Sequence, residues 1–165
     1  MGSKLLSASY IRNFVFGVED SLVSTVGLLS GITVAGVSRQ DLILTGVVLI
    51  FVEAFSMAVG SFLSEHSAEE FITHTEAPAK NALLGGSVMF LSYFIAGFIP
   101  LFPYLLIQVS IALWVSIALS LFTLFGLGIS SAKLSRVHIL EHGFRMFLIG
   151  GLAIAVGVVV GRLLR

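Results

Sequence analysis

The stretch NALLGGSVMFLSYFIAGFIPLFPYLLIQVSIALWVSIALSLFTLFGLGISSA, residues 81–132, contains no Asp, Glu, Lys, Arg or His. As a single α-helix its 52 residues would be about 78 Å long, whereas the hydrocarbon core of a bilayer is about 30 Å thick. The chain must therefore turn within this stretch. Pro100 and Pro103 lie near its midpoint and predict the break, because proline interrupts helical hydrogen bonding. Two membrane-spanning helices are expected, at about residues 83–102 and 104–127.

The composition of the whole chain also indicates a membrane protein. Of its 165 residues, 57% are hydrophobic and only 11% are charged, whereas a soluble domain carries about 25% charged residues. Nine basic and nine acidic residues cancel, so no net positive field favours nucleic acid as a partner. The absence of cysteine excludes disulfides, thiolate metal sites and iron–sulfur clusters. We therefore expect one domain over residues 1–165, embedded in the lipid bilayer.

Three further apolar segments of spanning length flank the central stretch, at about residues 14–36, 42–63 and 146–164. Two polar segments, 64–81 and 130–145, contain most of the remaining charged side chains. The predicted fold class is therefore all-α, an integral membrane bundle of five transmembrane helices.

Basic residues predict the orientation of this bundle. With five crossings, one side of the membrane carries six basic residues and the other carries three; the six are Lys4, Arg12, Lys80, Lys133, Arg136 and Arg145, and the three are Arg39, Arg162 and Arg165. Cytoplasmic loops are enriched in Lys and Arg, so the N-terminus and both polar segments are expected in the cytoplasm. The compact size and the lack of a targeting extension favour a prokaryotic cell membrane, or the vacuolar membrane if the source is eukaryotic.

Three acidic side chains interrupt the first two spanning segments. Glu19 and Asp20 lie in the first, and Glu53 lies in the second, with Met57 one helical turn further on. An acidic side chain at the bilayer centre costs about 2.5–3.5 kcal/mol, so such residues usually face a bundle interior or an ion path. If the two segments are antiparallel neighbours, Asp20 and Glu53 differ in depth by about 8–10 Å. They would be successive ion-binding positions on one path, and Met57 would lie closer to the depth of Asp20.

Carboxylate oxygen together with thioether sulfur favours particular cargo ions. Oxygen ligands suit hard and borderline divalent ions and a thioether adds softness, so Fe²⁺ fits Asp20, Glu53 and Met57 better than Mg²⁺ or Ca²⁺ does, and Mn²⁺ fits the oxygens. A buried carboxyl group also exchanges protons near neutral pH, so it can bind metal and proton in alternation. This pattern predicts a proton-coupled metal antiporter. No nucleophile–His pair, phosphate loop or cofactor signature is present, so neither an enzyme nor a bound cofactor is expected.

Other polar side chains are secondary candidates for metal binding. One is Glu19, which adjoins Asp20 but points about 100° away on a helix. Four more belong to segment 64–81, where helical spacing places them on two neighbouring stripes: Glu65, His66, Glu69 and Glu70. These four could gather divalent cations before the pore, or they could form a solvated helix face.

Small and imidazole side chains leave two more alternatives open. Gly27 and Gly31 in the first spanning segment, and Gly157 and Gly161 in the last, have the spacing that lets membrane helices approach closely. Their contacts could lie within one protomer or between the protomers of a homodimer. His138 and His142 lie four residues apart, and this pair could bind a metal ion or be solvated.

Four ordered motifs resemble the vacuolar iron transporter (VIT-like) family over nearly the whole chain. They are RNFVFGVEDSLVST (residues 12–25), SMAVGSFL (56–63), IPLFPY (99–104) and FLIGGLA (147–153). The resemblance implies a five-helix homodimer that exports Fe²⁺, and often Mn²⁺, from the cytoplasm in exchange for protons.

The resemblance also implies roles for individual residues. By motif match, Asp20 and Met57 take the family's ion-path positions. The family's second-helix Glu falls at Leu49 here, and the acid stands one turn later, at Glu53. The long cytoplasmic insertion of plant and yeast-like members is reduced here to the short segment 64–81, so this chain is similar to a short form of the family.

Two other function classes fit part of the pattern. A small proton-coupled exporter of organic cations would also need a membrane-buried Glu53, but it would give Met57 no special role. A non-transport membrane scaffold would bury the acids only as structural partners, for example of Arg12 or of Ser and Thr hydroxyls.

Overall fold

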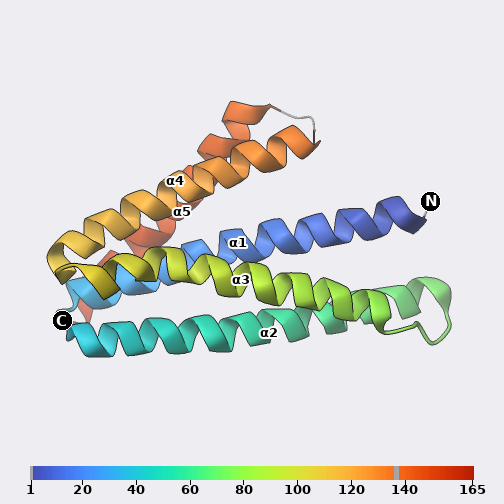
Figure 1. Cartoon of the computed structure of the whole chain (residues 1–165), viewed down its shortest axis with the longest axis horizontal. Helices are drawn as coiled ribbons and strands as arrows, with labels where there is room; N and C mark the ends of the chain where they lie inside the picture. The colour runs from blue at the N-terminus through green and yellow to red at the C-terminus, as the bar shows by residue number, and fades with distance from the viewer. Residues whose placement is uncertain (1, 136–137) are drawn as a thin grey trace.

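The computed structural model describes residues 2–135 and 138–165 (Figure 1). This part of the chain forms five α-helices and no β-strand: α1 (Gly2–Val34), α2 (Arg39–Thr73), α3 (Lys80–Leu106), α4 (Val109–Ser135) and α5 (Ile139–Leu163). All five are long and apolar enough to cross a membrane, which confirms the predicted all-α membrane fold. The two termini lie at opposite ends of the bundle, as five crossings require (Figure 1). Arg136, one of the six basic residues that predict the cytoplasmic side, lies outside the described residues.

The helices extend beyond the apolar segments from which they were predicted. α1 begins at Gly2 rather than near residue 14, and α2 continues through half of the polar segment 64–81. The apolar length sets where a helix leaves the bilayer and not where it stops being helical. α2 ends where His74 adopts the left-handed conformation (φ 51°) and its N–H donates to the Glu70 carbonyl oxygen.

The predicted break at Pro100 and Pro103 was wrong. Both prolines lie inside α3, and the chain turns after it, at residues 107–108. A proline inside a membrane helix is tolerated when a neighbouring helix supplies hydrogen bonds to the disturbed backbone. The carbonyl groups that the two prolines leave without a helical N–H donor are those of Ala96 and Ile99. Next to them, the Ser116 hydroxyl of α4 donates to the Pro100 carbonyl oxygen at 2.7 Å and joins this part of α3 to α4.

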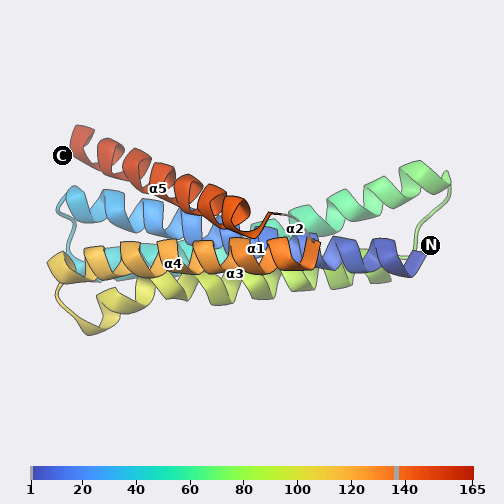
Figure 2. The ribbon, with the colours of Figure 1, turned by 90° about the horizontal axis from the view of Figure 1, so that it is seen from above.

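α3 is the central helix of the bundle. It packs on both α1 and α2, and α5 packs on α1 and α4. Figure 1 shows α3 between α1 and α2, and Figure 2 shows α5 running beside the second half of α1. At the end where α1 finishes, buried apolar side chains fill the space between the first four helices: Leu29, Leu42, Ile50, Leu101, Tyr104 and Ala112.

The glycine pairs pack α1 against α5 within one protomer. A Cβ atom placed on Gly31 would lie 2.6 Å from the Gly157 carbonyl oxygen, and Cβ atoms on Gly157 and Gly161 would collide with the carbonyl oxygens of Gly27 and Gly31. Small residues at this contact let the two backbones approach closely. Of the two alternatives, the described contacts of all four glycines are therefore those of intra-protomer packing.

Candidate functional site

The candidate site begins with two carboxyl groups that belong to different helices. Asp20 of α1 and Glu53 of α2 are both half-buried, and they lie close enough for their charges to interact. Within the described residues, neither carboxyl group accepts a hydrogen bond or forms an ion pair with a basic side chain. Two acidic groups on neighbouring helices therefore lie within electrostatic range of each other, and no basic side chain in the described part of the chain pairs with either.

A small residue on α3 permits this approach. Gly97 lies where α1 and α2 converge, and a Cβ atom there would lie 2.9 Å from the Ser21 hydroxyl and 2.7 Å from Cγ1 of Ile50. Ser21 is the residue after Asp20, and Ile50 lies one turn before Glu53. The close packing at Gly97 therefore fixes the backbone of both acid-bearing helices.

Tyr93 of α3 adds a hydroxyl group to the acidic pair. Its side chain is fully buried, its hydroxyl lies 2.8 Å from the Ser24 hydroxyl, and its phenol group is within electrostatic range of both Asp20 and Glu53. The Ser21 hydroxyl donates to the Tyr93 carbonyl oxygen at 2.6 Å. Tyr93 was not predicted from the sequence as a site residue. A tyrosine inside an uncharged spanning segment is nevertheless a signal, because a buried phenol hydroxyl usually requires a polar partner.

A cleft of about 970 Å³ opens between the helices on the side where α1 begins. Glu19 of α1 and Met57 of α2 both line it, with serine hydroxyls from α2 and α4. Asp20 and Glu53 are not among its lining residues. The structure thus divides the predicted candidates into an acidic pair, Asp20 and Glu53, and a cleft that contains Glu19 and Met57.

Glu65 is engaged in a hydrogen-bond network that joins α2 to α1. Its carboxylate accepts hydrogen bonds from the Arg12 guanidinium at 3.0 Å, from the Asn13 amide at 2.7 Å and from the Ser9 hydroxyl. Gly85 of α3 leaves the space that this network occupies. Arg12 therefore pairs with Glu65 and not with an acid deeper in the membrane.

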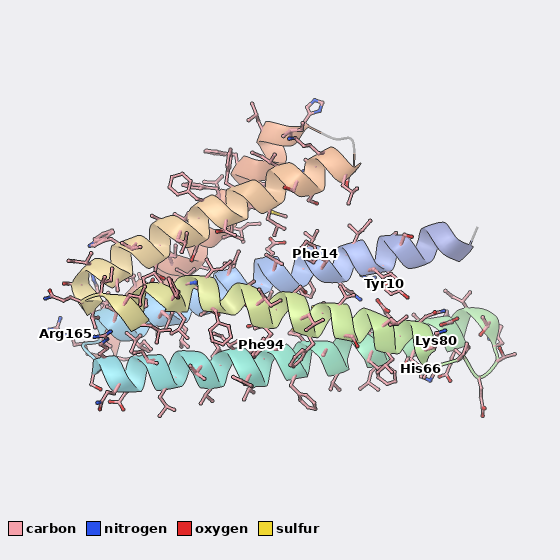
Figure 3. All side chains as sticks on the ribbon, viewed as in Figure 1. Tyr10, Phe14, His66, Lys80, Phe94 and Arg165 are labelled. Carbon is pink, nitrogen blue, oxygen red and sulfur yellow. The ribbon has the colours of Figure 1, made fainter. Side chains whose placement is uncertain are left out.

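The other candidates on α2 make only local contacts. His66 stacks on Phe62, and its Nε2 lies 3.5 Å from a carboxylate oxygen of Glu70. The Glu69 backbone carbonyl accepts a hydrogen bond from the Thr73 hydroxyl. Figure 3 labels His66 and Lys80 at the same end of the bundle, where α2 ends and α3 begins. Among the described residues, no three His, Asp or Glu side chains gather into a group that could hold a metal ion.

Comparisons with known proteins identify relatives along nearly the whole chain. The sequence profile described as the VIT family matches residues 11–84 and 72–162. Vacuolar iron transporter homolog 1 from Oryza sativa subsp. japonica is 26% identical over 172 residues, covering 90% of this chain and 71% of that protein. Vacuolar iron transporter homolog 3 from Arabidopsis thaliana is 29% identical over 170 residues, covering 90% of this chain and 80% of that protein. Vacuolar iron transporter 1, also from Arabidopsis thaliana, is 22% identical over 205 residues, covering 88% and 82%.

Proposed function

The chain belongs to the VIT family, and from this premise we propose that it moves Fe²⁺, and also Mn²⁺, out of the cytoplasm in exchange for protons. The family assigned from the sequence motifs is correct, and it is a family of transporters rather than enzymes. The metal ion is cargo here and not a cofactor. The protein is a multi-pass membrane protein. The excess of basic residues on one side supports a cytoplasmic N-terminus as part of this proposal.

The acidic pair of Asp20 and Glu53 is the observation that carries this proposal. Two carboxylates within electrostatic range repel each other, and within the described residues no basic side chain balances them. A divalent cation cancels both charges at once, and two bound protons do the same. Occupancy by one metal ion or by two protons therefore leaves the pair equally neutral, which is the physical basis for exchanging one for the other.

The neighbouring groups favour a borderline transition-metal ion as the cargo. The Tyr93 and Ser24 hydroxyls add neutral oxygen atoms beside the carboxylates, and Met57 adds a thioether on the same face of α2 as Glu53. Oxygen ligands with a thioether nearby suit Fe²⁺ and Mn²⁺ better than they suit an organic cation, which would require an aromatic-lined pocket.

The direction of transport is supported by the asymmetry of the bundle. The 970 Å³ cleft opens on the side where α1 begins, which the basic residues assign to the cytoplasm. The opposite end is closed by the apolar core around Leu29, and Arg39 donates to the carbonyl oxygens of Tyr104 and Leu105 at 2.9 and 2.8 Å. This conformation accepts ions from the cytoplasmic side, as an exporter must.

We also propose that the protein works as a homodimer. A single chain offers only two carboxylates at the acidic pair, and within its described residues no group of three metal-binding side chains exists. A second copy would supply further ligands. An apolar groove of about 640 Å³ along α1 and α5, lined by Gly27 and Gly31 among others, is the face on which it would pack. The mass of the purified protein, measured by light scattering with the detergent subtracted, tests this proposal.

Transport in proteoliposomes tests the function. Purified protein is reconstituted with a trapped pH dye and challenged with Fe²⁺ or Mn²⁺ under a proton gradient. We expect metal-dependent proton flux that is lost in Asp20→Asn and in Glu53→Gln. The matched control is Asp41→Asn, because Asp41 is an exposed acid at the start of α2.

The outcomes separate the competing functions. Flux that is unchanged in both membrane-acid variants would refute the role of the acidic pair. No flux in the unmodified protein with any cation would favour a scaffold. Flux driven by an organic cation but by no divalent metal would refute the cargo. Met57→Leu distinguishes these cases further, because it should weaken metal transport and leave organic-cation transport intact.

A further inference from the structure

Two buried hydroxyl groups beyond the acidic pair have no hydrogen-bond partner among the described residues. They belong to Thr25 of α1 and Ser120 of α4, and both residues are 0% exposed. A buried hydroxyl normally bonds to a protein group or to an ordered water, because an unpaired one bears the full cost of its removal from water. The two hydroxyls therefore point to a ligand that the neighbouring side chains do not supply.

Thr25 faces the part of α3 that contains the prolines. It lies on the same four-residue ridge of α1 as Ser21 and Thr33. The Ser21 hydroxyl donates to the Tyr93 carbonyl oxygen at 2.6 Å, and the Thr33 hydroxyl donates to the Tyr104 hydroxyl at 3.3 Å. Because Thr25 lies between these two contacts, it packs against α3 between the two tyrosines.

Ser120 faces the same part of α3 from the other side. Ser116, one turn before it, donates to the Pro100 carbonyl oxygen at 2.7 Å. Leu124, one turn after it, is buried in a cluster with Ala96. Ser120 lies between these two contacts on one ridge of α4, so it packs against α3 between Ala96 and Pro100.

The backbone of α3 contributes a free acceptor at this level. The Ala96 carbonyl group lacks a helical N–H donor because residue 100 is proline, and Ala96 is only 3% exposed. Leu22, three residues before Thr25, belongs to the same buried cluster as Ala96 and Leu124. The junction of α1, α3 and α4 therefore gathers two hydroxyl groups and one carbonyl oxygen inside an otherwise apolar core.

We propose that these three groups hold an ordered water molecule, and that this water relays protons between the outer side of the membrane and the acidic pair. A buried water typically makes about three hydrogen bonds, and the Thr25 hydroxyl, the Ser120 hydroxyl and the Ala96 carbonyl oxygen would provide them. Water and hydroxyl groups both donate and accept hydrogen bonds. Each proton hop forms one O–H bond and breaks another, so the water and the hydroxyls are regenerated and one proton moves on.

Hydroxyl groups continue on both sides of this water site. Toward the acidic pair, Ser24 adjoins Thr25 in the chain, and its hydroxyl lies 2.8 Å from the Tyr93 hydroxyl. Toward the outer end, the next hydroxyls are those of Thr33 and Tyr104, which bond to each other. The apolar core closes this end of the bundle to a hydrated metal ion, whereas a proton needs only a line of hydrogen-bonding groups.

This relay would give the two exchanged ions separate routes to the acidic pair. The metal ion arrives through the cytoplasmic cleft, and the proton arrives through the hydroxyl groups on the opposite side. Protons could then load the pair while the outer end stays closed to metal. The relay rests on the proposed exchange function, whereas the binding of water does not.

Nuclear magnetic resonance detects the water directly. The full chain is prepared in detergent with ¹³C-labelled alanine methyl groups, and we expect a cross-peak between water and the Ala96 methyl group in a rotating-frame NOE spectrum. The cross-peak should remain when Asp20→Asn and Glu53→Gln abolish exchange. It should disappear when Thr25→Val and Ser120→Ala remove both hydroxyls.

Proton flux in proteoliposomes tests the relay. Thr25→Val and Ser120→Ala should each slow Mn²⁺-driven proton flux at least about tenfold, whereas Mn²⁺ binding, counted by electron paramagnetic resonance, should be unchanged. The matched controls are Thr45→Val and Ser87→Ala, which remove exposed hydroxyls that bond to carbonyl oxygens of their own helices at 2.7 and 2.8 Å. Neither control should alter the flux.

The outcomes decide both parts of the proposal. A missing water cross-peak at Ala96 in the unmodified protein would overturn the water site, and undiminished flux in the variant that lacks both the Thr25 and Ser120 hydroxyls would overturn the relay. Gel filtration and helical circular dichroism establish that each variant is folded. Failure of the proposed function would instead appear as a lack of Mn²⁺-driven flux in the unmodified protein, with the water cross-peak still present.

Discussion

Replacing Glu65 tests whether this residue stabilises the bundle or captures metal. Its carboxylate is 15% exposed and accepts hydrogen bonds from three α1 side chains. Asn13 is only 2% exposed, so Glu65→Ala leaves a buried amide without its acceptor, which costs about 1–3 kcal/mol. Arg12 is 66% exposed, so the loss of that ion pair adds only about 0–1 kcal/mol. We expect Glu65→Ala to lower the free energy of unfolding by about 2–3 kcal/mol.

Two companion variants should lower the free energy of unfolding less than Glu65→Ala does. Glu65→Gln keeps an oxygen acceptor for Asn13 and should cost about 1 kcal/mol, and Arg12→Ala removes only the exposed partner and should cost less than about 1 kcal/mol. Unfolding is measured by titration with SDS in mixed micelles, followed by circular dichroism. Transport by Glu65→Gln in proteoliposomes should keep its apparent Mn²⁺ affinity. An Arg12→Ala variant less stable than Glu65→Ala, or a tenfold loss of Mn²⁺ affinity in Glu65→Gln, would refute the structural role.

Three further predictions concern the packing of α1 on α5, the tyrosine beside the acidic pair and the end of α3. Gly31→Leu should destabilise the bundle by at least about 2 kcal/mol, because its Cβ would lie 2.6 Å from a backbone carbonyl oxygen of α5. Gly151→Leu should not destabilise it, because the space around Gly151 is open. Thermal unfolding of the two variants measures the difference. Tyr93→Phe removes the hydroxyl that bonds to Ser24 and should slow metal-driven proton flux about tenfold while costing only about 1 kcal/mol in the SDS titration. Arg39→Ala removes two hydrogen bonds to the end of α3 and should cost about 1–2 kcal/mol, and faster hydrogen exchange at residues 104–108 would report the local loosening.

The sequence determines the helices better than it determines where they turn. The lengths of the apolar segments predicted five spanning helices, because the thickness of the bilayer sets the length of a spanning helix independently of its packing partners. The position of the turn after α3 depends on tertiary contacts, such as the Ser116 hydroxyl that bonds to the Pro100 carbonyl. Local rules for proline do not include such a contact, which is why the predicted break was misplaced.

The candidate site was predictable by residue type but not by arrangement. Asp20 and Glu53 stood out because acids are costly in a membrane. Helix rise predicts depth along one helix and not the distance between two helices, so the approach of α1 and α2 at Gly97 could not be predicted from it. Tyr93 was not predicted, because its importance depends on which helices pack against it.

The acidic pair does not contribute to the stability of the fold. The described bundle is held by the apolar core around Leu29, by the glycine contacts between α1 and α5, and by the Glu65 network. None of these involves Asp20 or Glu53, and each acid costs about 2.5–3.5 kcal/mol at bilayer depth. Their mutual repulsion adds to that cost. Asparagine and glutamine in these places would keep the shape and remove the repulsion, so fold stability does not account for the two charges, whereas the proposed exchange of a cation for protons requires them.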